Sequence, residues 1–162
     1  MSTRHRKKLM AILVLILLLF NLTGCINREL TDEDLIVNLV DTWVKGFKEK
    51  NLDKYMGVYS PSLIIEEQDG EGNTLETYNY VEKYRRVKEI FETTTSVSAV
   101  TNAVNVVVLG LVATATFFVD YEITSTIDNI ESTNKWSEYV IWTLDKGWGF
   151  WSVNYGKFQN IN

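Results

Sequence analysis

The strongest constraint on the fold is a long run of strand-forming residues between Val97 and Phe158, with few breaks and many aromatic side chains. From Val112 to Ile123, apolar residues such as Phe117 and Tyr121 occupy every second position. Alternation with a period of two predicts a β-strand with two different faces, because successive side chains point to opposite sides of a sheet. The chain is therefore expected to be built on a sheet.

This run divides into about four strands joined as an antiparallel meander. The expected strands cover residues 97–108, 111–122, 135–144 and 148–158. Leu109-Gly110 ends the first strand, and Asp145-Lys146-Gly147 is the predicted turn before the last, since glycine tolerates the positive φ of tight hairpin loops. Gly149 would then mark a bulge or bend within the last strand.

Two helices and a short strand are predicted ahead of the meander. Apolar residues recur at spacings of three and four over 36–47, which predicts an amphipathic helix. Thr31 caps this helix, with Asp34 three residues on as a weak capping box. A short helix is expected over 54–59 and a short strand over 62–66.

A third helix is predicted over 79–92. Tyr84 and Val87 lie on its expected apolar side. Basic residues on this helix, including Lys83 and Arg86, are interleaved with glutamates, which is typical of a solvated face.

The N-terminus has the pattern of a secretory signal. Four basic residues within positions 4–8 precede an apolar run over 9–20, which is shorter than the roughly 20 residues of a spanning helix. Leu22-Thr23-Gly24-Cys25 follows and resembles the bacterial lipoprotein box, in which the signal is cut before a cysteine that receives lipid. The alternatives are a plain signal peptide or a short membrane anchor, with Cys25 incidental. We expect a signal peptide over 1–24, a lipidated tether over 25–30 and one folded domain over 31–162.

The net charge expected after signal removal limits the kinds of partner that the domain can bind. Cleavage would take four of the 16 basic residues and none of the 21 acidic ones, which leaves 12 against 21 and a net charge of about −9. Such a domain is repelled by nucleic acid and by anionic membrane surfaces. Membrane contact is therefore expected through acyl chains such as palmitate on Cys25. The expected location is the bacterial cell membrane or outer membrane, facing the extracytoplasmic side.

The inventory of reactive side chains excludes several chemistries. The only histidine, His5, leaves with the signal, and the only cysteine, Cys25, is the expected lipid site. Ser-His, Cys-His and histidine–metal sites are thus excluded from the mature chain, and no cofactor is expected. Any catalysis would depend on Asp, Glu, Tyr or Lys.

One loop partly matches a calcium-binding pattern. Glu67, Asp69 and Glu71 have the spacing of the first EF-hand ligands, with Gly72 at the sixth position. The twelfth position is Tyr78, where an EF-hand has a bidentate glutamate. A solvated hairpin loop is the favoured interpretation, and weak calcium binding is the alternative.

The order of elements resembles the nuclear transport factor 2-like superfamily, which includes SnoaL-like polyketide cyclases and ketosteroid-isomerase-like proteins. The resemblance rests on the Trp43 helix that runs into residues 51–53, on residues 59–62, on the strand over 111–122 and on the hairpin at Gly147-Trp148. It implies an α+β fold of the cystatin-like type. A strongly curved, cone-shaped, mostly antiparallel sheet of four to six strands would pack against three N-terminal helices, with a pocket between them.

Aromatic residues are expected to line the implied cone, where they would suit a small apolar ligand. The pocket candidates are Trp43, Phe47, Tyr55, Tyr59, Tyr84, Phe117, Tyr121, Trp136 and Trp142. The alternative is that they simply fill the core. Asp120 and Glu138 are the sheet carboxylates that could act as a base if buried, although strand parity predicts that Asp120 is exposed.

The sequence favours a lipid-anchored binding or assembly domain. A small cofactor-independent isomerase, dehydratase or cyclase is the alternative, although the family's pocket histidine is absent and no tyrosine–aspartate pair can be transferred. A purely structural partner module is a third possibility. Both faces of the sheet are expected to be apolar, with Trp136 and Trp142 on one side and Tyr139 and Ile141 on the other. Because three helices can cover only one face, a homodimer through the other face is predicted.

Overall fold

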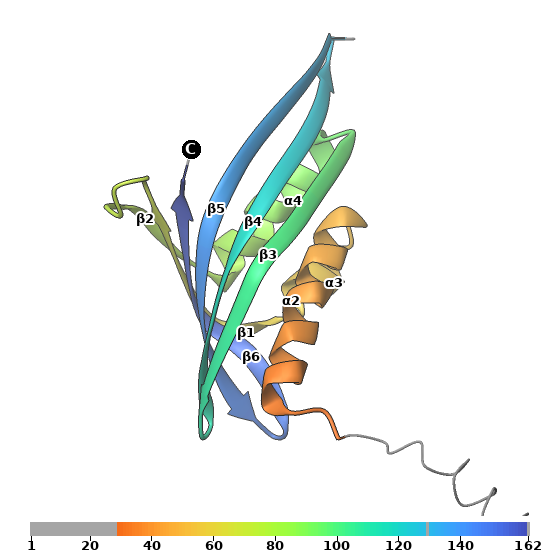
Figure 1. Cartoon of the computed structure of the whole chain (residues 1–162). Helices are drawn as coiled ribbons and strands as arrows, with labels where there is room; N and C mark the ends of the chain where they lie inside the picture. Colours follow the sequence, from red (N-terminus) through yellow and green to blue (C-terminus); the bar gives the residue numbers. More distant parts are fainter. Residues whose placement is uncertain (1–28, 129, 162) are drawn as a thin grey trace, which may run out of the picture. The chain divides into compact units, whose positions relative to one another are not determined.

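A single sheet with the strand order β2-β1-β6-β5-β4-β3 forms the frame of the domain (Figure 1). The computed structural model describes residues 29–128 and 130–161, so the predicted signal and Cys25 lie outside the described residues. The strands are β1 (Tyr59–Gln68), β2 (Thr74–Asn79), β3 (Ser96–Leu109), β4 (Val112–Ile127), β5 (Ile130–Gly147) and β6 (Phe150–Asn160). All neighbours are antiparallel except β1 and β6, which are parallel.

Three helices pack on the sheet: α2 (Asp32–Lys48), α3 (Leu52–Met56) and α4 (Tyr80–Thr93). The sheet curves and stays open, and the long β4–β5 hairpin extends at one end beyond the helices (Figure 1). Odd-numbered β4 residues from Ala113 to Ile123 are buried, as their alternation predicts. We call this side of the sheet the inner face and the opposite side the outer face. The predicted α+β class is confirmed.

Helix α2 begins where its sequence predicts. The Thr31 side chain accepts from the Asp34 backbone N–H and Asp34 bonds back to Thr31, so the predicted capping box is present. Residues at spacings of three and four bury one stripe of the helix against the sheet. Helix α3 follows closely, because Gly46 has no Cβ: one built there would lie 2.5 Å from the Tyr55 backbone nitrogen.

Three local predictions need correction. The second helix ends at Met56 rather than near Tyr59, and Pro61 lies in β1 where the β1–β6 register is interrupted. The β5–β6 turn is Trp148-Gly149, both with positive φ, rather than Asp145-Lys146-Gly147. Strand β2 is not predicted, because Tyr78 is the one buried residue in it and leaves no alternating pattern.

No helix in the part of the chain that the structure describes is long and apolar enough to cross a membrane.

Candidate functional site

Under α2, aromatic side chains fill the inner face of the sheet. The Trp43 ring lies 5.3 Å from Trp142, 5.9 Å from Phe117 and 5.4 Å from Tyr55, measured between ring centroids. Tilted and edge-on rings at such distances are the favoured aromatic packing. Six of the nine pocket candidates belong to this cluster and are at most 5 % exposed: Trp43, Phe47, Tyr55, Tyr59, Phe117 and Trp142. We call them the aromatic core.

The aromatic core is not wholly apolar. Among the described residues, Trp43 Nε1, the Tyr59 hydroxyl and Trp142 Nε1 are buried without a hydrogen-bond partner. Burial raises the pKa of Tyr59 well above its ordinary value, so the hydroxyl stays neutral. Unpaired buried polar groups are rare in proteins, and a polar atom of a ligand would satisfy them. Ligand contact by these residues stays a prediction.

Under α4 the inner face changes character, because Lys83 points into it. Lys83 is only 9 % exposed. Its Nζ lies 4.6 Å from the centre of the Phe158 ring and about 6 Å from the rings of Tyr78 and Tyr55. Within the described residues, no carboxylate oxygen approaches this amine within 4.0 Å and no acceptor hydrogen-bonds to it. The ammonium group thus lies against aromatic faces.

The charge of Lys83 is retained despite this burial. Burial by itself lowers the pKa of the amine. The electrostatic influence of Tyr55, Tyr78 and two glutamates outweighs it, and the pKa of Lys83 lies above its ordinary value. The side chain is therefore an ammonium ion at neutral pH.

Glu138 is the nearby carboxylate on the inner face of β5. Burial raises the pKa of Glu138, and the positive charge of Lys83 offsets only part of that rise. Trp136 Nε1 donates a hydrogen bond of 3.1 Å to Glu138 Oε1. Tyr121 lies on the neighbouring strand, and burial and Glu138 together raise the pKa of its hydroxyl. Of the two carboxylates singled out in the sequence, Glu138 is half-buried on the inner face, whereas Asp120 is exposed.

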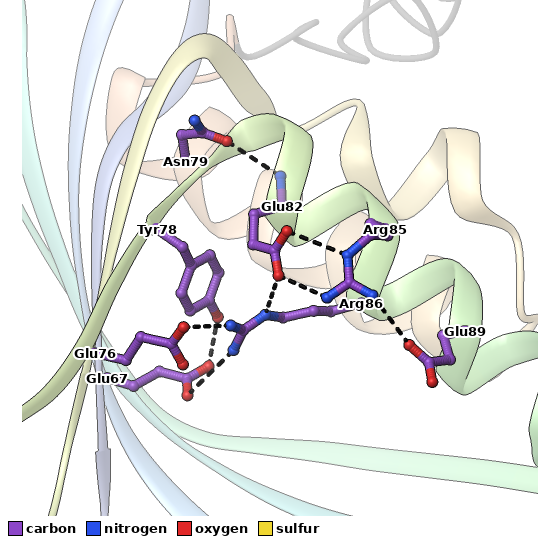
Figure 2. A network of polar contacts seen from close by, with 8 residues as sticks. All are labelled: Glu67, Glu76, Tyr78, Asn79, Glu82, Arg85, Arg86 and Glu89. Carbon is purple, nitrogen blue, oxygen red and sulfur yellow. Dashed lines mark hydrogen bonds and ion pairs between the residues drawn. The ribbon is translucent and has the colours of Figure 1, made fainter.

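A second set of charges holds α4 to the β1–β2 hairpin, as Figure 2 shows. Arg86 Nε donates to Glu82 Oε1 at 3.0 Å, and its guanidinium group also pairs with Glu76 on β2. The same group lies 4.3 Å above the Tyr78 ring, whose hydroxyl donates to Glu67. We call these residues the Arg86 network.

A groove of about 420 Å³ opens between α4 and this hairpin. It is lined by Glu67, Tyr78, Lys83, Arg86, Val87, Glu89, Ile90 and Thr93. We call it the α4 groove. Lys83 gives it a buried cation, and Val87 and Ile90 give it an apolar wall. This combination suits a small amphipathic molecule with one anionic group.

No family model matches the chain, and no curated protein matches its sequence. Solved structures match its fold. A nuclear transport factor 2-like superfamily protein from Salmonella enterica serovar Typhimurium has a TM-score of 0.66 at 10% identity, covering 80% of this chain and 91% of its own. The chain therefore shares the nuclear transport factor 2-like fold of this structure.

Two further structures agree. A proposed dehydratase of the nuclear transport factor 2-like family from Streptomyces avermitilis has a TM-score of 0.65 at 11% identity, covering 81% of this chain and 97% of its own. A proposed calcium/calmodulin-dependent protein kinase II association domain from Xanthomonas campestris has a TM-score of 0.61 at 16% identity, covering 78% and 86%.

The three pocket candidates outside the aromatic core lie in different surroundings. Tyr121 and Trp136 stack on the inner face with ring centroids 4.8 Å apart, next to Glu138. Tyr84 is 38 % exposed and lies outside the buried stripe of α4, so its place in a pocket stays a prediction. Asp120 is exposed, as strand parity predicts, and accepts a hydrogen bond of 2.5 Å from Ser137 Oγ.

The main residue that sequence reasoning missed is Lys83. It was assigned to a solvated face, and that prediction is wrong for this position. Lys83, Val87 and Phe91 are four residues apart and form the buried stripe of α4. This spacing was the available signal, but the charge of Lys83 argued against an inward position. Arg86 lines the groove and pairs with Glu82 on the same helix.

The loop with the partial calcium pattern is the β1–β2 turn. Asp69 Oδ1 accepts from the backbone N–H groups of Glu71 and Asn73, at 3.0 and 2.8 Å. In the described ranges 29–128 and 130–161, no three His, Cys, Asp or Glu side chains are grouped so that they could hold a metal ion. The carboxylate of Asp69 thus serves the turn itself.

Proposed function

We propose that this protein is a lipid-anchored, extracytoplasmic binding domain whose α4 groove holds a small amphipathic ligand by its anionic group. The observation that carries the proposal is the Lys83 ammonium, which is buried, charged and without a hydrogen-bond partner among the described residues. A structural lysine normally has an acceptor, because a buried charge without one is costly. An anionic group in the groove would supply it.

The apolar part of the ligand would lie along the wall of the groove. Val87 is buried and Ile90 is half-buried, and both line the same hollow as Lys83. The aromatic core beneath is already occupied by its own side chains, so the groove rather than the centre of the sheet offers room. This shifts the ligand expected from the sequence toward α4.

The binding proposal is tested with an anionic amphiphile, such as decanoate or an anilinonaphthalene sulfonate dye. Wild-type protein should bind it saturably, and Lys83→Met should weaken binding by at least tenfold, since one charge-assisted hydrogen bond contributes about 1.5–3 kcal/mol. The readouts are calorimetry and dye fluorescence, with circular dichroism as a check on folding.

Lys88→Met is the matched control. Lys88 lies on the same helix but is exposed and pairs with Glu92 at 3.7 Å. Its variant should bind like wild type. Equal affinity of the Lys83 and Lys88 variants would refute a role for the buried ammonium.

Anchoring through Cys25 is the second part of the proposal. It is supported by the sequence of residues 1–25, where a basic start, an apolar run and the only cysteine fall in register. Cys25→Ala should move the protein from the detergent-extracted membrane fraction to soluble or unprocessed forms. A cleaved Cys25→Ala protein that stays in the membrane would contradict it, as would a wild type that never takes up labelled fatty acid.

Pairing through the outer face of the sheet is the third part. Phe118 is 41 % exposed there, its ring centroid lies 5.0 Å from that of Tyr139, and Ile141 is half-buried beside them. The Xanthomonas neighbour is a proposed association domain, which favours assembly. Ile141→Lys should convert a dimer into a monomer in light scattering. A wild-type monomer at tens of micromolar would exclude the pair.

An enzyme is the alternative function, and Glu138 is the observation that favours it. A carboxyl group with a raised pKa beside Tyr121 can take and return a proton. The Streptomyces neighbour, a proposed dehydratase, is compatible with such chemistry. Loss of water from β-hydroxy carbonyl compounds, followed by absorbance of the conjugated product, tests it. Glu138→Gln should abolish any turnover, and turnover that survives would assign the chemistry elsewhere.

A further inference from the structure

The end of the sheet next to the start of α2 carries exposed apolar residues on two neighbouring turns. The β3–β4 turn presents Leu109 and Leu111, which are 77 % and 67 % exposed. The β5–β6 turn presents Trp148, which is fully exposed, and Phe150, which is 78 % exposed. We call the two segments, 109–111 and 148–150, the base turns. They contain no charged residue, in a chain that has 21 acidic residues.

The base turns form one surface. The Lys146 backbone N–H donates to the Leu111 carbonyl oxygen at 2.8 Å and ties the two hairpins together. Both turns lie at the lower end of the sheet in Figure 1, at the same end as the first residues of α2. A hollow of about 170 Å³ lined by Leu35, Leu39, Gly149, Phe150 and Trp151 continues the apolar surface onto α2.

Trp148 occupies a backbone position that disfavours it. Its φ is 51°, in the left-handed region where tight hairpins prefer Asn, Asp or Gly. The β4–β5 turn at the other end has Asp128 at φ 52°, the expected kind of residue. A tryptophan in this conformation, with its ring wholly in solvent, contributes no packing to the domain. Backbone strain at a residue that adds no packing contact to the fold is typical of a functional site.

The start of α2 lies beside the hairpin that carries the β5–β6 base turn. Lys146 Nζ lies 2.5 Å from Asp32 Oδ1, and Trp151 Nε1 donates to the same oxygen at 3.0 Å. Cys25 is six residues before Thr31, and a chain of that length spans at most about 20 Å. A lipid on Cys25 would therefore hold the bilayer surface within about 20 Å of Thr31, at the start of α2.

We propose that the base turns dock into the bilayer surface, with Trp148, Phe150, Leu109 and Leu111 at the level of the lipid headgroups. Tryptophan favours this zone, because its ring is apolar and its N–H can still reach water. The net charge of the mature chain is about −9, so docking depends on apolar insertion and not on attraction to anionic lipid. The proposal rests on lipidation of Cys25 and goes beyond it by fixing which end of the domain faces the membrane.

The test uses the full-length lipidated protein in phosphatidylcholine vesicles whose acyl chains carry bromine, a quencher of tryptophan fluorescence. The other four tryptophans are buried or half-buried, so Trp148 is the natural reporter. Wild type should be quenched, and Leu111→Asp combined with Phe150→Asp should remove most of that quenching while keeping Trp148. Ile130→Asp is the matched control, since Ile130 is 72 % exposed near the β4–β5 turn at the other end, and it should quench like wild type.

Three results would overturn the docking proposal. The first is equal quenching of the wild type and the double variant. The second is a wild type quenched no more than Trp148→Ser. The third is a Trp148 already shielded from aqueous iodide in lipid-free Cys25→Ser protein, because another copy would then cover it. Mass spectrometry of the same samples separates the two proposals: an acylated but unquenched protein refutes docking alone, whereas an unacylated protein refutes both anchoring and docking.

Discussion

The two halves of the inner face lie on the same sheet and differ in what covers them. Under α2, Trp43 brings an aromatic ring to a surface that is already aromatic, and the rings pack closely. Under α4, Lys83 brings a charge to the same surface, next to Glu138 and the Arg86 network. Burial of apolar area stabilises a domain, whereas buried charge costs free energy unless it is paired. The first half therefore stabilises the fold, and the second holds charges whose burial costs stability.

The largest loss of stability is expected from Trp43→Ala, in the half of the inner face under α2. Trp43 is fully buried and contacts five other rings, so its removal should lower the free energy of unfolding by about 3–5 kcal/mol. Urea denaturation followed by circular dichroism measures the change. Trp148→Ala is the control, because the same residue type is fully exposed there, and it should change stability by less than about 0.5 kcal/mol. Similar losses in both variants would deny the importance of the aromatic core.

A smaller loss should follow from Gly46→Ala, which tests how tightly α3 packs against α2. A Cβ at this position would meet backbone atoms of Tyr55 at 2.5 and 2.8 Å, and backbone cannot move aside as a side chain can. Overpacking should cost about 1–3 kcal/mol, even though alanine favours helix. Thermal melts of the wild type and of both variants measure the effect. Gly147→Ala, whose Cβ would meet no atom within 4 Å, is the control and should be close to neutral. Equal melting temperatures of all three proteins would mean that the helices are free to separate.

The half of the inner face under α2 was largely predictable from the sequence, and the half under α4 was not. Alternation in β4 and the helical spacing around Trp43 predict both elements and their buried faces, because burial of apolar residues obeys the periods of the strand and the helix. Lys83 obeys the same helical spacing, yet its charge predicts solvent. Its inward position depends on Phe158, which is distant in sequence, and on Tyr78 in β2, a strand that the sequence does not predict. Likewise, Glu138 shares a strand face with Trp136, but only the packed sheet and helix determine how deeply it is buried.

Arg86→Met should have a moderate effect, because it removes the charge that joins α4 to the β1–β2 hairpin. Glu82 would lose the Arg86 pair that helps to hold its pKa at about 2, and the Tyr78 ring would lose its guanidinium. The Arg86 side chain is 29% exposed, so solvent screens these contacts, and the expected cost is about 1 kcal/mol. Arg85→Met, at a side chain 63% exposed, should cost less than Arg86→Met, because solvent screens its ion pairs more fully. If 1 M salt left the difference between wild type and Arg86→Met unchanged, the ion pairs would not be its cause.

The smallest expected effect lies in the pH dependence of stability. Glu66 and Glu82 have pKa values lowered to about 2, so their contribution is present above pH 4.5 and is lost as the pH falls toward 2. The contribution of Glu138 to stability changes with pH in the opposite direction, because burial raises its pKa. Its contribution is complete below pH 4.5, the ordinary value for glutamate, and declines as the pH rises through the raised pKa.

Glu138→Gln should remove that decline, so that the variant keeps its stability above pH 4.5 while the wild type loses some. The amide oxygen of glutamine can still accept from Trp136 Nε1, so packing and hydrogen bonding are preserved. Glu122→Gln, on the outer face where Glu122 pairs with Lys135 at 2.9 Å, should leave the decline intact. Urea denaturation at a series of pH values measures the slopes. Parallel curves for wild type and Glu138→Gln would mean that Glu138 ionises as freely in the folded protein as in water, and the contrast between the two halves would then rest on Lys83 alone.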